Sequence, residues 1–186
     1  MFINRSLICL LSFGILFLTS CEKDEPDPPN QEEVITTLTY TLTPADGGET
    51  VVLSFRDLDG DGGNAPEISG GTLSANTTYE GVLNLLNETE SPAESITDEI
   101  QEEADEHQFF FTSTLPGLSF VYLDQDDNGA PLGLSSALTT DNEADGSITV
   151  ILRHEPNKSA TGVADGDITN AGGETDIEVT FPVDVQ

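Results

Sequence analysis

The stretch VITTLTYTL, residues 34–42, alternates apolar side chains with threonine and isoleucine. Alternation with a period of two is typical of a β-strand that has one buried face. Threonine, isoleucine and tyrosine are also residues that strands favour. We therefore predict a half-buried strand here, with an apolar face made by Val34, Leu38, Tyr40 and Leu42.

The same pattern returns along the rest of the chain. Clusters of Gly, Asp, Asn and Pro separate six further apolar runs, which lie at residues 51–55, 79–86, 109–111, 118–122, 148–152 and 177–183. Seven or more short strands with turn signals at this spacing favour two packed antiparallel sheets. The prediction is an all-β fold: an antiparallel, immunoglobulin-like β-sandwich of about 7–9 strands over residues 34–186.

One helix is expected between the strands. The segment Ser91-Pro92-Ala93-Glu94 reads as a capping box with proline at the first helical position. Apolar residues follow at helical spacing, with acidic residues on the other face. We expect this short helix to cover an open end of the sheets through Ala93, Ile96, Ile100 and Ala104.

The first twenty residues have the pattern of a signal peptide. Arg5 precedes a nearly unbroken apolar run that ends at Leu18, which is too short for a permanent membrane span. The residues Leu18-Thr19-Ser20-Cys21 resemble the lipobox of bacterial lipoproteins. This resemblance implies cleavage before Cys21 and a diacylglycerol on its sulfur. The alternative is an ordinary cleaved signal followed by a chance cysteine.

Residues 21–33 are expected to form a tether. After Cys21 they read EKDEPDPPNQEE, which is acidic, rich in proline and without apolar periodicity. Lys23-Asp24-Glu25 resembles the export signal of Bacteroidota lipoproteins. That resemblance implies an outer-membrane lipoprotein that faces the cell surface.

Composition excludes several classes of function. The chain has five Lys and Arg against 35 Asp and Glu, a formal net charge of −30. Such a field repels phosphate, so nucleic acid is excluded as a partner, while cations are favoured. The only cysteines are Cys9 and Cys21. Since the signal peptide and the lipid would take both, disulfides and cysteine catalysis are excluded from the folded part.

Two loops match the first half of a calcium-binding loop, D-x-D-x-[DN]-G. The twelfth position, where a bidentate glutamate belongs, is Ile68 in the first loop and Ser135 in the second. Calcium loops and plain acidic surface turns therefore both remain open. The candidate calcium ligands are Asp57, Asp59 and Asp61 in one loop and Asp124, Asp126 and Asn128 in the other.

The chain has two histidines. Glu103 and His107 lie one helical turn apart, so their side chains could share a metal ion. Alternatively, His107 complements the negative end of its helix. His154 follows a predicted strand and stands beside Glu155, with no clear partner in the sequence.

Enzyme signatures are missing from the sequence. It contains no G-x-S-x-G, H-E-x-x-H or G-x-x-x-x-G-K-[ST] motif. A hydrolase with paired carboxylates is the remaining enzymatic alternative, but acids are so frequent that no pair stands out. Tryptophan is absent, which weakens stacking on sugars. We therefore expect a protein that is not an enzyme.

Three segments resemble small Bacteroidota (flavobacterial) envelope lipoproteins, some of them labelled as type 1 periplasmic-binding-fold proteins: DLDGDGGNAP (57–66), EEADEHQFFF (102–111) and ITNAGGETDIEVTFPV (168–183). The resemblance carries over no activity. A periplasmic-binding fold alternates strands and helices, which one helix among many strands does not fit.

The expected function is that of a lipid-anchored binding or accessory module, with calcium as a candidate ligand. Its expected partners are the membrane, through the lipid on Cys21, and an envelope protein or a glycan. Two alternatives stay open: a glycan-binding accessory lipoprotein of a nutrient-uptake system, and a carboxylate-dependent hydrolase.

Overall fold

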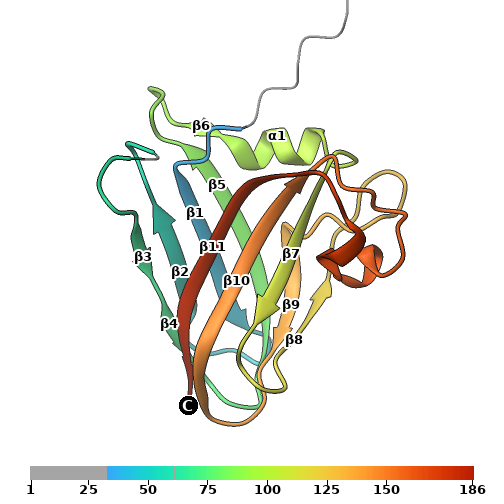
Figure 1. Ribbon diagram of the computed structural model, residues 1–186. Coiled ribbons are helices and arrows are strands. Elements are labelled where there is room, and N and C mark those ends of the chain that lie inside the picture. Colours follow the sequence, from blue (N-terminus) through green and yellow to red (C-terminus); the bar gives the residue numbers. More distant parts are fainter. Residues whose placement is uncertain (1–32, 61) are drawn as a thin grey trace, which may run out of the picture. The chain divides into compact units, whose positions relative to one another are not determined.

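The computed structural model describes residues 33–60 and 62–186. The predicted signal peptide, the lipidation site Cys21 and the tether as far as residue 32 lie outside the described residues, and so does Asp61. In the described part the chain forms two β-sheets that pack face to face (Figure 1). The predicted all-β sandwich is confirmed.

The larger sheet has seven strands, all paired antiparallel. Its order is β3 (Glu67–Ser69), β2 (Val51–Arg56), β1 (Thr37–Pro44), β5 (Thr78–Asn87), β9 (Ser135–Thr139) and β8 (Ser119–Tyr122), with β6 (Glu94–Ser95) on β5. The smaller sheet has the order β4 (Gly71–Leu73), β11 (Glu174–Val185), β10 (Ala144–His154) and β7 (His107–Ser113). Its β4–β11 pair is parallel.

The core lies between the two sheets and is made by the inward face of each strand. In β1 these side chains are Leu38, Tyr40 and Leu42, all fully buried as the alternation predicted. Val34, which the sequence placed on the same face, is instead exposed and precedes the strand. The Tyr40 hydroxyl is hydrogen-bonded to Ser136 Oγ at 2.7 Å, which satisfies a polar group inside the core.

All seven predicted strands are present, but the described chain has eleven. Three of the additional strands, β3, β4 and β6, have only two or three residues. The fourth, β9, buries a serine and a leucine, Ser136 and Leu138. None of them carries an apolar alternation long enough to be recognised in the sequence.

A single residue, Gly70, separates β3 in the larger sheet from β4 in the smaller one. A Cβ atom at this position would lie 1.8 Å from the backbone oxygen of Pro182. Only glycine allows the chain to change sheets so close to the backbone of β11.

The phenylalanine run 109–111 serves two apolar layers. Phe109 and Phe111 belong to the main core, while Phe110 faces the other side of the smaller sheet. There it packs with Ile151 against the segment that holds the two 3₁₀ helices, η1 (Val163–Asp165) and η2 (Ile168–Asn170).

The described residues contain one short α-helix, as predicted, but it begins later than predicted. The helix α1 spans Ile96–Glu102, and Ser95 is its N-cap: the Ser95 hydroxyl oxygen accepts a hydrogen bond from the amide of Asp98. The predicted cap at Ser91 is therefore wrong, because Glu94 pairs with Asn87 as part of β6. Ile96 and Ile100 are buried where the helix covers the end of the core (Figure 1). No helix in the described part is long and apolar enough to cross a membrane.

Candidate metal centre

Two histidines meet at the end of the core that lies near α1. His107 is the first residue of β7 and His154 is the last residue of β10, and the two are register partners in the smaller sheet. Each has the same parity as a core residue of its strand, Phe109 or Leu152, so each imidazole faces inward. The two ring centroids lie 4.6 Å apart.

A β-bulge brings Asp176 to the same place. In the β10–β11 pairing, Leu152 lies opposite Ile177 and Arg153 lies opposite Thr175, so Asp176 is the additional residue. A bulge of this kind turns a side chain that alternation would send outward. The Asp176 side chain is fully buried.

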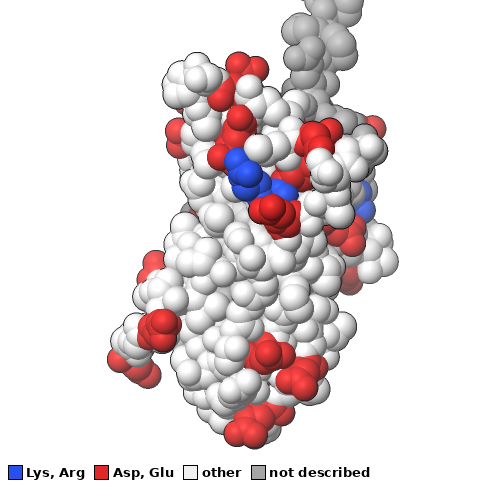
Figure 2. Space-filling view, turned by 90° about the vertical axis from the view of Figure 1, so that its left-hand side faces the viewer, with Lys and Arg blue, Asp and Glu red and all other residues white. Residues whose placement is uncertain are grey.

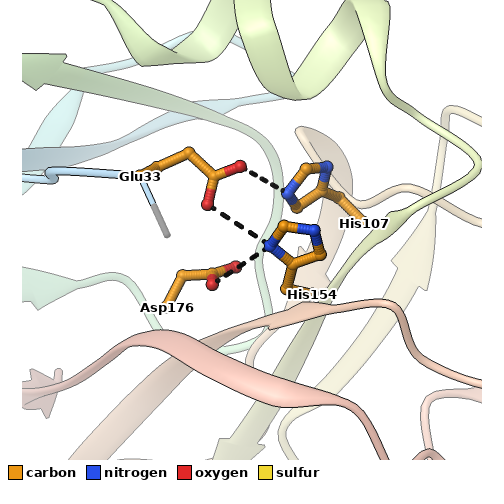
Figure 3. Close-up of side chains that lie close together, drawn as sticks. All are labelled: Glu33, His107, His154 and Asp176. Atoms are coloured by element: carbon orange, nitrogen blue, oxygen red, sulfur yellow. Dashed lines mark hydrogen bonds and ion pairs between the residues drawn. The ribbon is translucent and has the colours of Figure 1, made fainter. Parts of the chain in front are cut away.

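Glu33 completes the group. It belongs to residues 33–36, which precede β1 and which we call the lead-in. The sequence analysis assigned this residue to the tether, but its side chain is only 6% exposed and contacts His107. Figure 3 shows the carboxylates of Glu33 and Asp176 directed toward the two imidazoles. We refer to Glu33, His107, His154 and Asp176 as the histidine–carboxylate cluster.

The ring nitrogens of His107 have different partners. Nδ1 lies 3.1 Å from the backbone oxygen of Glu103, and Nε2 lies 2.8 Å from Oε1 of Glu33. Because a carbonyl oxygen can only accept, Nδ1 carries a proton. Glu103 is the C-cap of α1, so this contact fits the alternative in which His107 complements the negative end of the helix. The contact involves the backbone of Glu103 and not its carboxylate.

The contacts of His154 are longer. Its Nδ1 lies 3.7 Å from Oε2 of Glu33 and 3.6 Å from Oδ1 of Asp176, and its Nε2 lies 3.9 Å from Oε2 of Glu106. These separations exceed hydrogen-bond range, but they still join charges of opposite sign when the imidazole is protonated.

The Glu33–His107 pair shifts both pKa values. Burial lowers the pKa of His107, but the hydrogen bonds to Glu33 and to the Glu103 carbonyl outweigh burial and raise it overall. Burial raises the pKa of Glu33, yet the hydrogen bond from His107 and the nearby imidazole charges lower it overall. In the absence of a metal ion, the two side chains therefore form an ion pair at mildly acidic pH.

The cluster has the composition of a metal site. One donor atom from each of its four residues can be chosen so that all lie within 4.8 Å of one another. Glu106 and Glu155 form a second such group with His154, at the exposed rim. Among the described residues, neither group includes an aspartate of the two predicted calcium loops.

In the first of these loops, hydrogen bonds from the loop itself occupy the carboxylates. Asp57 Oδ1 accepts from the amide of Gly60 at 2.9 Å. Asp59 Oδ2 accepts from the amide and from the side chain of Asn64, at 3.0 and 2.7 Å. These contacts lower the pKa of Asp59. The third candidate, Asp61, lies outside the described residues, so calcium in this loop stays a prediction.

In the second loop, the acidic side chains hold neighbouring segments. Asp124 accepts hydrogen bonds from the amides of Gly133 and Ser135 at 2.7 and 2.9 Å, which fixes the start of β9 beside the end of β8. Asp126 is buried and pairs with Lys158 at 3.0 Å. The third candidate, Asn128, is exposed and donates its amide to Asp126. Calcium here also stays a prediction, although Lys158 already supplies a positive charge to Asp126.

Comparison of the chain with known protein families, with curated proteins and with solved structures found no match. The resemblance to Bacteroidota envelope lipoproteins is therefore still a prediction.

Proposed function

We propose that the protein is a lipid-anchored, non-enzymatic binding or accessory module on the outer face of an outer membrane. The observation that carries the proposal is the lipobox-like stretch that ends at Cys21, followed by an acidic, proline-rich segment and then by the sandwich. A module on such a tether can reach partners beyond the membrane surface.

The burial of the two histidines counts against acid–base catalysis by them. In the described part of the chain, His107 is fully buried and the His154 side chain is 7% exposed. A general acid or base must reach the proton that it transfers. Neither buried imidazole is therefore placed to exchange a proton with a substrate, which counts against a catalytic role for the two histidines.

The charge distribution supports a role for the uncharged surface in partner binding. Figure 2 shows the side on which β3 lies: acidic side chains gather in its upper and lower parts, and much of the surface between them carries no charge. The strands β2 and β3 expose Val52 and Ile68. Exposed apolar side chains on adjacent strands can contribute to a contact with another protein.

Intact-mass analysis of the protein extracted from membranes tests the anchor. We expect a chain that begins at Cys21 and carries the mass of a diacylglycerol, and we expect Cys21→Ala to lose this mass. Protease treatment of whole cells tests the orientation. Alanine substitution of Lys23, Asp24 and Glu25 should keep the lipid but protect the sandwich from protease. An unlipidated N-terminus in the native protein contradicts the proposal.

A second candidate, a glycan-binding accessory lipoprotein, is favoured by one cavity. This cavity of about 380 Å³ contains Phe120 and Tyr122 from β8 together with Asp124 and Asp165. Aromatic rings beside carboxylates can bind sugars. The aromatic rings stack on the sugar rings, and the carboxylate oxygens accept hydrogen bonds from the sugar hydroxyl groups. Soluble polysaccharides retained by the native protein and by Val52→Ala, but not by Phe120→Ala, would favour this candidate. Release of reducing sugar in the same assay would favour the hydrolase.

A further inference from the structure

The histidine–carboxylate cluster has the donor set of a transition-metal site. Two imidazole nitrogens and two carboxylate oxygens suit zinc and its first-row neighbours, whereas calcium prefers six to eight oxygens. The four residues come from three strands and from the lead-in to β1. They therefore converge only in the folded chain.

Two separations within the cluster are close to those between ligands of one ion. Metal–ligand bonds of about 2.0–2.1 Å in a tetrahedron place neighbouring donor atoms about 3.3–3.4 Å apart. Nδ1 of His154 lies 3.6 and 3.7 Å from its two carboxylate oxygens, too far for a hydrogen bond. The 2.8 Å contact between His107 and Glu33 would have to open by about half an ångström.

The tautomer of His107 is already set for a metal. Its Nδ1 proton is directed at the Glu103 carbonyl, which leaves Nε2 as the nitrogen that faces the cluster. Metal-binding histidines commonly donate their second nitrogen to a backbone carbonyl or a carboxylate in this way. In His154 the nitrogen on the other side of the ring from the cluster is Nε2, and it lies 3.9 Å from a carboxylate oxygen of Glu106.

The charge and the hydrogen bonding of the buried carboxylates are compatible with a bound cation. Glu33 and Asp176 bring two carboxylates into a buried place, with side chains 6% and 0% exposed. Among the described residues, Glu33 Oε2 is buried and accepts no hydrogen bond. A divalent ion would neutralise both carboxylates while both histidines stay neutral, which removes the cost of an unbalanced buried charge.

We propose that Glu33, His107, His154 and Asp176 bind one zinc-class divalent metal ion, and that this ion fastens the lead-in of the chain to the smaller sheet. Four protein ligands in a buried place correspond to a closed, structural site and not to a catalytic one. The proposal goes beyond the proposed function, since it holds whether or not the chain is lipidated.

A cavity lies beside the cluster. It measures about 470 Å³ and is bordered by the lead-in residues Val34–Thr36, by Asp57 and Asp59 of the first loop, and by Asp176. Acidic side chains at the mouth of such a cavity raise the local concentration of cations.

Metal titration of the full-length chain, extracted in detergent and stripped with a chelator, tests the proposal. We expect one zinc ion per chain and, with cobalt, the visible absorption of a tetrahedral site. Asp176→Asn and His154→Gln should weaken zinc binding by more than the roughly 10–100-fold that loss of an outer-shell partner costs. The matched control is Asp184→Asn, an exposed aspartate of the same strand, and it should bind zinc as the native chain does.

Two results would overturn the proposal. One is a native chain that takes up no zinc beyond the level of a non-specific acidic surface. The other is equal zinc binding by Asp176→Asn and Asp184→Asn. If the cluster variants do not fold, X-ray absorption by the zinc-loaded native chain decides: imidazole scattering from two ligands supports the site, and oxygen ligands alone exclude it.

Discussion

The ion pair of Asp126 and Lys158 shows how one buried acid is satisfied within this acidic chain. The Asp126 side chain is 2% exposed, and its second oxygen accepts hydrogen bonds from the amides of Asn128 and Ala130. Lys158 Nζ also donates to the backbone oxygen of Ala104. The pair therefore connects the second predicted calcium loop to the segment that follows α1.

Removal of Lys158 should be costly. In Lys158→Met, the carboxylate of Asp126 stays buried without its cation, and we expect the free energy of unfolding to fall by about 3 kcal/mol. Urea denaturation at neutral pH measures this loss. The double variant Lys158→Met/Asp126→Asn should recover part of it, because it leaves no unpaired charge. A loss below about 0.5 kcal/mol in the single variant would show that the pair contributes nothing.

The same pair predicts a dependence of stability on acid. Burial raises the pKa of Asp126, but Lys158 and the backbone amides lower it below its ordinary value of 3.8. The stabilisation is therefore present above the unfolded-state pKa and is lost as the pH falls through the lower, folded-state pKa. Urea denaturation from neutral pH to about pH 2 should show the native chain losing its advantage over Asp126→Asn. Parallel curves for the two proteins would contradict this expectation.

At the scale of the element, α1 depends on Ser95. Ser95→Ala removes the side-chain acceptor for the Asp98 amide, so we expect a loss of about 1 kcal/mol in the free energy of unfolding. Ser91→Ala is the matched control, because Ser91 is exposed and precedes the helix, and it should change stability by less than about 0.5 kcal/mol. Thermal denaturation of both variants checks the difference. A larger loss of stability for Ser91→Ala than for Ser95→Ala would instead support Ser91 as the cap, as the sequence suggested.

The crossing at Gly70 gives a second prediction at this scale. In Gly70→Ala the new methyl group would meet the Pro182 carbonyl, and backbone cannot move aside as a side chain can. We expect the free energy of unfolding to fall by about 1–3 kcal/mol, the usual cost of overpacking. Thr72→Ala, at an exposed position of β4, should be nearly neutral. Equal melting temperatures for the two variants would show that the crossing adjusts freely.

At the scale of the whole molecule, apolar periodicity predicted the sandwich and its long strands, but not the short strands β3, β4 and β6, nor β9. Long alternating strands such as β1 and β11 are visible because burial on one face repeats every second residue. The strand β9 is not recognisable in the sequence, because Ser135 and Ser136 interrupt the apolar alternation. Its place is set by hydrogen bonds to β5 and β8, which no local pattern reveals.

The site was predictable only in part. The parity of His107 with Phe109, and of His154 with Leu152, places both imidazoles on inward faces, so the sequence contained a signal for half of the cluster. Glu33 was concealed in an acidic run. Asp176 faces inward only because a bulge shifts the register of β11, and a bulge is not visible as a pattern of residues.

Anomalous X-ray diffraction at the zinc absorption edge, from crystals of the zinc-loaded chain, is the most direct measurement. We expect one peak at about 2.0–2.2 Å from donor atoms of Glu33, His107, His154 and Asp176. Crystals without a peak between these side chains, in which His107 Nε2 still lies 2.8 Å from Glu33, would contradict the metal site and leave the cluster a buried ion pair.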